Sequence, residues 1–217
     1  HHYAGAKPGE GDGFRLEGSP GDSTANTCLF HYGLFTWTLN NIQLPKAFPD
    51  TPLKIVTTPF EHRQYMNVCT FGYTMPYWGW EQWERELDWM ALHGIDMPLS
   101  PIGSEAIFAR VWRSLGLTEE EIGDFMAGAA HLPWFRMGNM SGIDGHPSQE
   151  WYDKTIALEH KIIDRMNELG MSPVYNAFAG FVPKGLKRVF PDAELVETGW
   201  ADGPDYFSSF IFPETEL

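Results

Sequence analysis

Residues 63–97 constrain the fold more than any other stretch of this sequence. An apolar run at 65–73 precedes an aromatic turn, a helical pattern at 78–93 and a second short apolar run at 95–99. The helical pattern repeats apolar residues at steps of three and four, which places them on one face of a helix. These residues are Trp80, Trp83, Leu87 and Met90. Gly94 follows, where a left-handed residue ends a helix. This order predicts a strand–helix–strand unit, and therefore a parallel sheet with helices outside it.

The same alternation of strand and helix continues along the chain. Thr118 and Glu121 have the spacing of a capping box, and Ser148 is placed to cap a long helix. Ser104 is the candidate N-cap of the helix that precedes them. The further elements expected are helices at 104–115, 118–128, 148–169 and 184–190, a loop at 131–145, and strands at 174–179 and 195–197. Three or four such repeats fit the first half of a (β/α)8 TIM barrel, which has about 250 residues when complete.

The first 60 residues have a different character from the rest. Residues 1–26 are dense in Gly, Pro, Asp and Ser, which is typical of a loop or a poorly ordered tail. Two strands are expected at 41–44 and 53–57, separated by a Pro-rich turn. The barrel-like part is therefore expected to occupy residues 61–217, as a domain distinct from residues 1–60.

Charge and motif content exclude several functional classes. The chain carries 29 Asp and Glu against 15 Lys and Arg, a net charge of −14, which argues against nucleic acid as a partner because phosphates would be repelled. The sequence has no run long enough to span a membrane, no metal-binding histidine motif and no nucleotide-binding glycine loop, so we expect no metal and no cofactor. Its two cysteines, Cys28 and Cys69, are expected to be free thiols rather than a disulfide.

Several motifs in residues 31–217 resemble those of the α-N-acetylglucosaminidase family. They are NVCT, W-x-x-W-E-R-E-x-D-W-M-A-L-x-G-I, GSEAIFARVWRSLGLTEEEI, LPWFRMGNM, GMSPVYNAFAGFVP and RVFP, in that order. The resemblance implies a retaining glycoside hydrolase that releases terminal α-linked N-acetylglucosamine from glycans. It also implies an α/β fold in which residues 1–60 are the remnant of a small α/β domain and residues 61–217 the first half of the TIM barrel. The implied location is lysosomal in animals and secreted or periplasmic in bacteria.

In a barrel the active site gathers on the loops that follow the strands. Asn67 and Cys69 are two residues apart and would share one face of a strand. From the pattern alone, Asn67 fits a residue of the barrel interior that is hydrogen-bonded to its neighbours. The resemblance instead implies that Asn67 and Cys69 both belong to the sugar pocket. Glu105 lies at the start of a helix, where its carboxylate could interact with the helix dipole or accept a hydrogen bond from a sugar hydroxyl, and the sequence leaves both roles open.

Three further residues become candidate walls of the sugar pocket through the resemblance. Trp134 and Met137 lie in LPWFRMGNM, a segment that could also be a loop folded onto the core. Trp200 follows Gly199 at the end of an expected strand. The predicted substrate-binding set is therefore Asn67, Cys69, Glu105, Trp134, Met137 and Trp200.

Catalysis by a retaining glycosidase requires two carboxyl groups about 5–5.5 Å apart. In the resembled family they are two glutamates of the barrel, the first in an Asn-Glu motif downstream of the stretch that corresponds to residues 210–214. The sequence ends at Leu217 without that motif, so we expect neither catalytic glutamate and no turnover from this chain. A half-barrel would leave a sheet edge unpaired, so we also expect marginal stability or self-association.

Two other functions stay open on the sequence. One is a non-catalytic carbohydrate-binding module that uses Trp134 and Trp200 as stacking platforms. The other is an unrelated barrel hydrolase that uses Glu105 together with Asp202 or Glu214. Sugar binding without turnover would favour the first, and loss of turnover on changing Glu105 to Gln would favour the second.

Overall fold

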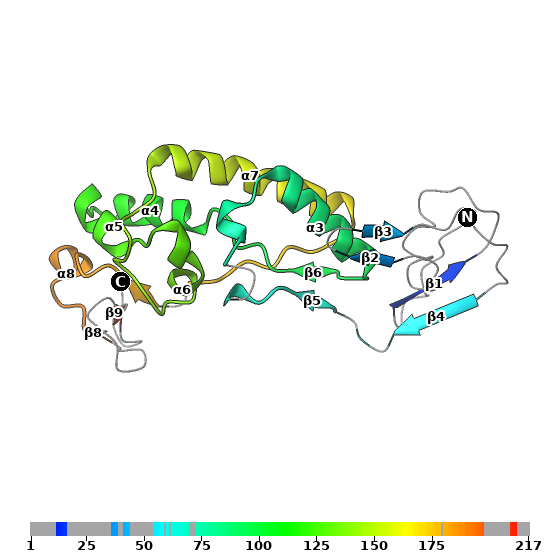
Figure 1. Cartoon of the computed structure of the whole chain (residues 1–217). Helices are drawn as coiled ribbons and strands as arrows, with labels where there is room; N and C mark the ends of the chain where they lie inside the picture. The colour runs from blue at the N-terminus through cyan, green and yellow to red at the C-terminus, as the bar shows by residue number, and fades with distance from the viewer. Residues whose placement is uncertain are drawn as a thin grey trace. The chain divides into compact units, whose positions relative to one another are not determined.

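The computed structural model describes residues 12–16, 36–38, 41–43, 54–58, 60, 62–69, 73–178, 180–197 and 209–211 (Figure 1). The chain forms two compact units, each assembled from three chain segments. The first contains residues 1–65, 83–98 and 165–173, and the second contains residues 66–82, 99–164 and 174–217. The expected domain boundary at residue 60 stays a prediction.

Two antiparallel strand pairs lie in the N-terminal part of the first unit. Strand β1 (Asp12–Leu16) pairs with β4 (Lys54–Thr58), and β2 (Thr36–Thr38) pairs with β3 (Asn41–Gln43). The strands expected at 41–44 and 53–57 are confirmed as β3 and β4. The expectation of loop throughout 1–26 was wrong for β1, because a partner strand some forty residues away satisfies its backbone groups, and local composition does not reveal such pairing.

Most of the predicted strand–helix–strand unit also belongs to the first unit. Strand β5 (Gln64–Tyr65) pairs in parallel with β6 (Met97–Pro98), and α3 (Trp80–Leu92) lies between them in the chain. Tyr65 packs its ring 5.2 Å from that of Trp89 and donates its hydroxyl to Glu86, which ties β5 to the helix. Trp83, Leu87 and Met90 are fully buried, so the predicted apolar face is confirmed at these three positions.

The expected barrel strands are shorter than predicted. Among the described residues of the run at 65–73, strand is confined to Tyr65, since Met66 has a φ of +88° and residues 68–69 are helical. In the described part of the strand expected at 174–179, residues 174–178, the strand is reduced to a parallel bridge between Val174 and Leu99. An apolar run becomes strand only where a neighbouring strand offers hydrogen bonds, and residues 175–178 are instead exposed coil.

The second unit is mainly helical, with α4 (Ser104–Ser114), α5 (Glu119–Phe125) and α6 (Leu132–Arg136) gathered together (Figure 1). Its core contains three aromatic rings in mutual contact. Phe125, Phe135 and Phe181 have ring centroids 5.2–5.6 Å apart in pairs. Phe135 meets both of the other rings edge to face, an arrangement that aromatic rings prefer, and Phe125 is tilted against Phe181. This packing joins α5, α6 and β7 (Phe181–Val182).

Two of the three predicted helix starts are confirmed. The Thr118 hydroxyl accepts from Glu121 N–H at 3.2 Å while the Glu121 carboxylate accepts from Thr118 N–H at 2.8 Å. The Ser148 hydroxyl accepts from Trp151 N–H at the start of α7 (Gln149–Glu168). The prediction for Ser104 was wrong, because Ser104 is already helical and Gly103, with a φ of +76°, is the N-cap. Its hydroxyl donates to the Pro101 carbonyl instead.

The segment expected to be a loop at 131–145 contains secondary structure. A 3-10 turn, η2 (Ala129–His131), leads into α6, and a second such turn, η1 (Met75–Tyr77), lies in the segment after β5. Leu132 and Phe135 are fully buried, which explains why this short segment is helical although its composition is that of a loop. Tertiary packing, rather than helix propensity, stabilises a helix of five residues.

The last strands do not continue a barrel. Strands β7, β8 (Leu195–Glu197) and β9 (Ser209–Ile211) form an antiparallel sheet in the order β7-β9-β8, with α8 (Leu186–Val189) between β7 and β8 in the chain. The strand expected at 195–197 is confirmed, but its antiparallel pairing differs from that of a barrel strand. Among the described residues, parallel pairing is confined to β5 with β6 and to the bridge between Leu99 and Val174.

Candidate functional site

The second unit is built from the segments that follow the parallel strands. Residues 66–82 come directly after β5, residues 99–164 after β6, and residues 174–217 begin at the bridged Val174. Because ligands of α/β sheets bind at the carboxyl ends of parallel strands, the site is to be sought among these segments.

A cysteine and a methionine bring two of these segments into contact. The Asn67 side-chain oxygen accepts from Cys69 N–H at 2.9 Å, and Cys69 Sγ lies 3.5 Å from Met137 Sδ. Cys69 is a free thiol and is partly buried, while Asn67 is exposed; Cys28 lies outside the described residues. Three residues that the sequence analysis selected therefore meet at the end of α6.

Trp134 lies on the same short helix, three residues before Met137, so the two side chains are neighbours along the helix. Its half-buried indole makes an edge contact with Tyr73 at 5.3 Å and lies 6.0 Å from the His131 ring. Tyr73 is 60% exposed, so this aromatic pair borders open surface. The His131 ring pairs with Asp144 at 2.6 Å. Sequence reasoning missed Tyr73 because it lay at the end of an expected strand.

Glu105 is fully buried, at 0% exposure, and its carboxylate accepts from Arg136 Nε at 2.5 Å. Arg136 is buried as well and is the last residue of α6, directly before Met137. The second carboxylate oxygen, Glu105 Oε2, is buried without a hydrogen-bond partner among the described residues. Glu105 thus connects the first turn of α4 to the end of α6, rather than lining open surface.

Sequence reasoning missed a second buried carboxyl, that of Glu159 on α7. Its Oε1 accepts from the Ser100 hydroxyl at 2.5 Å, and Ser100 follows the bridged Leu99 at the carboxyl end of the second strand. The pKa of Glu159 is raised to about 7, chiefly because the group is buried and also because Glu105 is near, although the Ser100 hydrogen bond and Arg136 act to lower it. Periodicity could have found this residue, because Glu159 lies three positions before the buried Ile162.

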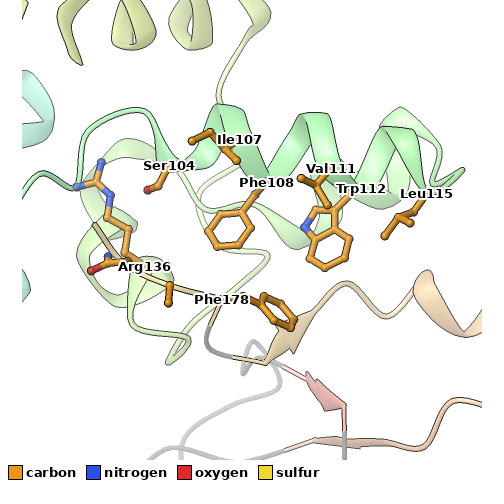
Figure 2. A pocket seen from close by; sticks show the side chains of 10 residues that line it. Ser104, Ile107, Phe108, Val111, Trp112, Leu115, Arg136 and Phe178 are labelled. Atoms are coloured by element: carbon orange, nitrogen blue, oxygen red, sulfur yellow. The ribbon is translucent and has the colours of Figure 1, made fainter. Parts of the chain in front are cut away.

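An apolar groove of about 350 Å³ runs along α4 (Figure 2). The rings of Phe108, Trp112 and Phe178 face it, and Arg136 stands toward the end where Ser104 lies. Phe178 is 59% exposed, and its position after Val174 puts the groove beside the carboxyl end of the third expected strand. The groove offers apolar surface, whereas the hydrogen-bonding groups lie around Asn67 and the end of α6.

Some predicted residues fall outside the described residues, namely Trp200, Asp202 and Glu214. Within the described part, no three His, Cys, Asp or Glu side chains are grouped as they would be to hold a metal ion. None of the helices described is both long and apolar enough to cross a membrane.

The model of the alpha-N-acetylglucosaminidase (NAGLU) TIM-barrel domain matches residues 63–217. The chain belongs to this family. Human alpha-N-acetylglucosaminidase is 44% identical over 185 residues, a match that covers 83% of this chain and 25% of the human protein. The chain therefore spans about a quarter of the length of that NAGLU relative.

Solved structures of family 89 glycoside hydrolases also match this chain. The family 89 enzyme from Clostridium perfringens, in complex with 2-acetamido-1,2-dideoxynojirmycin, superposes with a TM-score of 0.77 at 31% identity, covering 86% of this chain and 21% of that one. A variant from the same organism with two glutamates changed to glutamine, in complex with its substrate GlcNAc-alpha-1,4-galactose, matches equally well. A TIM-barrel domain as the class of fold follows from these matches.

Proposed function

We propose that this chain is part of a retaining glycoside hydrolase that releases terminal α-linked N-acetylglucosamine, and that it supplies part of the sugar pocket. The observation that carries the proposal is the meeting of Asn67 and Cys69 with Met137 and Trp134 at the end of α6. These side chains come from two segments that follow parallel strands, which is where a barrel enzyme builds its site.

Each of these residue types suits one part of the sugar. The Asn67 amide can donate to and accept from ring hydroxyls. Trp134 offers a rigid apolar ring face with Tyr73 at its edge, against which the apolar face of the sugar ring can stack. Met137 and Cys69 provide a soft, adaptable wall suited to the methyl group of an N-acetyl substituent. Trp200 is proposed as a further wall on the family resemblance alone.

The buried pair with Arg136 supports an indirect role for Glu105. A fully buried carboxylate held by a guanidinium has no open face to offer a sugar, whereas it can hold the end of α6 in place. The same burial counts against the alternative in which Glu105 is a catalytic carboxylate.

We place neither of the two catalytic carboxyl groups on these 217 residues. The retaining mechanism needs a nucleophile and an acid/base, and the Clostridium variant with its substrate carries two glutamates changed to glutamine. We therefore expect sugar binding without hydrolysis from this chain. Self-association also stays a prediction.

Binding of 2-acetamido-1,2-dideoxynojirmycin to the folded chain, measured by calorimetry, tests the proposal, with 1-deoxynojirimycin as the control that lacks the N-acetyl group. Selective binding of the acetamido compound, without release of the aryl group from an aryl α-N-acetylglucosaminide, is the expected result. Hydrolysis by the pure chain would show that a carboxyl pair is present in it. Equal or absent binding of both compounds to a folded sample would refute the proposed pocket.

A further inference from the structure

Four buried side chains from four segments form what we term the acid cluster: Ser100, Glu105, Arg136 and Glu159. Arg136 Nε donates to Glu105 Oε1, and the Ser100 hydroxyl donates to Glu159 Oε1, each over 2.5 Å. The segments are held close at Gly103, whose ideal Cβ would lie 3.8 Å from the Cβ of Glu159. The first turn of α4 and the middle of α7 therefore bring two carboxyl groups together.

The cluster has two carboxyl groups and one guanidinium. A buried carboxylate without a counter-charge is strongly unfavourable, so one of the two carboxyl groups has to hold a proton. Arg136 pairs directly with Glu105, whereas Glu159 receives only a neutral hydroxyl. Glu159 is therefore the group that is protonated. Its Oε2, buried without a hydrogen-bond partner in the described part of the chain, is an oxygen that a proton can occupy.

The other groups that face the cluster do not change this assignment. Tyr175, in the segment after Val174, faces Glu159, and Tyr152 on α7 faces Glu105. Burial raises the pKa of both hydroxyls, that of Tyr152 to about 12, so both stay neutral around pH 7. Neither tyrosine can supply the missing positive charge.

The cluster acts on the proposed pocket through Arg136. This residue ends α6, Met137 follows it and touches Cys69, and Trp134 precedes it by two positions. An ionised Glu159 would compete with Glu105 for the Arg136 guanidinium. Movement of Arg136 toward Glu159 would then displace the end of α6. Since α6 has only five residues, it has few hydrogen bonds within the helix to keep its last turn in place.

We propose that Glu159 is a positioning residue. While Glu159 is protonated it does not compete for Arg136, so Arg136 stays paired with Glu105 and holds Trp134 and Met137 in place for the sugar. This inference rests on the proposed function for its effect on sugar binding, while its effect on α6 is independent of any ligand. The pKa of Glu159, raised to about 7 chiefly by burial, sets the range: the cluster is intact in acid and loosens as pH rises through 7.

The decisive comparison is between the unmodified chain and Glu159→Gln, which is neutral at every pH and close to isosteric with the protonated acid. Two quantities are measured from pH 5.5 to 8.5. The first is the Kd of PUGNAc, which has no group that titrates in this range and is bound in another solved structure of the Clostridium perfringens enzyme. The second is the alkylation rate of Cys69, measured by mass spectrometry on the peptide that contains it. Glu150→Gln, on an exposed part of the same helix, is the matched control.

We expect PUGNAc affinity to fall about tenfold between pH 6.5 and 8.5 in the unmodified chain and in Glu150→Gln, and to stay flat in Glu159→Gln. The alkylation rate of Cys69 in the unmodified chain is divided at each pH by the rate in Glu159→Gln, which removes the effect of pH on the thiol itself. This ratio is expected to rise over the same range. In Glu105→Gln, Arg136 is left to Glu159, so both transitions are expected to move to lower pH.

Both profiles unchanged by Glu159→Gln in a folded protein would overturn the inference, and so would an unmoved transition in Glu105→Gln. A transition in Cys69 alkylation without any PUGNAc binding would instead refute the proposed sugar pocket and keep the positioning role of Glu159 on α6. The two failures are therefore distinguishable.

Discussion

Arg136 Nε and Glu105 Oε1 are 2.5 Å apart and both side chains are almost wholly buried, at 2% and 0% exposure. A buried ion pair contributes little net stability when both partners are present, because each charge has lost its hydration. Removing one partner is nevertheless strongly destabilising, because it leaves the other charge buried without a counter-charge. This pair joins α4 to α6, so the position of the candidate pocket wall depends on it.

Arg136→Ala is expected to lower the free energy of unfolding by about 3–5 kcal/mol, because Glu105 would be left as an uncompensated buried charge. Urea unfolding followed by circular dichroism measures this change. Arg165→Ala is the control, because Arg165 pairs with Asp88 at a similar distance, 2.6 Å, but both side chains are about a third exposed. This variant should lose about 1 kcal/mol or less of unfolding free energy. Equal losses in the two variants would contradict the prediction.

Stability should fall as pH rises through the range set by Glu159. The folded-state pKa of Glu159 is raised to about 7 from 4.5, so the folded chain holds a proton that the unfolded chain has lost between these values. The stability from this group is thus fully present below about pH 4.5 and is lost as pH rises to about 7. Glu159→Gln is expected to match the parent near pH 4.5 and to exceed it at pH 8.5 by up to about 3 kcal/mol.

Unfolding curves at both pH values check the sign. Glu86, whose pKa burial also raises, contributes the same trend to both proteins and cancels in their difference. A variant that is less stable than its parent at pH 8.5 would show that Glu159 is ionised and stabilising there.

Trp134→Ala is expected to weaken binding of 2-acetamido-1,2-dideoxynojirmycin by about fivefold or more, since loss of an aromatic stacking face removes about 1 kcal/mol or more. Trp151→Ala, which removes a half-buried indole from α7 in contact with Tyr152, is the control for a general loss of packing. Calorimetry on both variants, each first shown to be folded, gives the comparison. Similar affinities in the two would remove Trp134 from the pocket.

The parts of the fold that sequence predicted best are those with local causes. The capping box at Thr118, the Ser148 cap and the buried face of α3 each depend on residues within one or two turns of one another. The failures have distant causes. β1 depends on β4, and α6 depends on the burial of Leu132 and Phe135 against the core, neither of which leaves a local pattern.

The candidate site divides in the same way. Asn67, Cys69, Trp134 and Met137 could be selected from family motifs, and the structure brings them near one another. Glu159 could not be selected from any motif, because its significance arises only when α7 packs its carboxyl group against Ser100 and beside Glu105. Periodicity alone would have marked it as a polar residue on a buried face.

Gly103→Ala is expected to destabilise the chain more than Gly116→Ala. Both glycines have a positive φ, +76° and +94°, so an L side chain costs about 1–2 kcal/mol of backbone strain at either position. A Cβ on Gly103 would also lie 3.2 Å from Ile156 Cδ1 on α7, whereas one on Gly116 would meet nothing within 4 Å. The extra loss, measured by urea unfolding, should be about 1 kcal/mol or more, and it should be accompanied by weaker PUGNAc binding because Gly103 begins the helix that carries Glu105. Equal destabilisation by the two substitutions would mean that α4 and α7 do not pack as closely as the acid cluster requires.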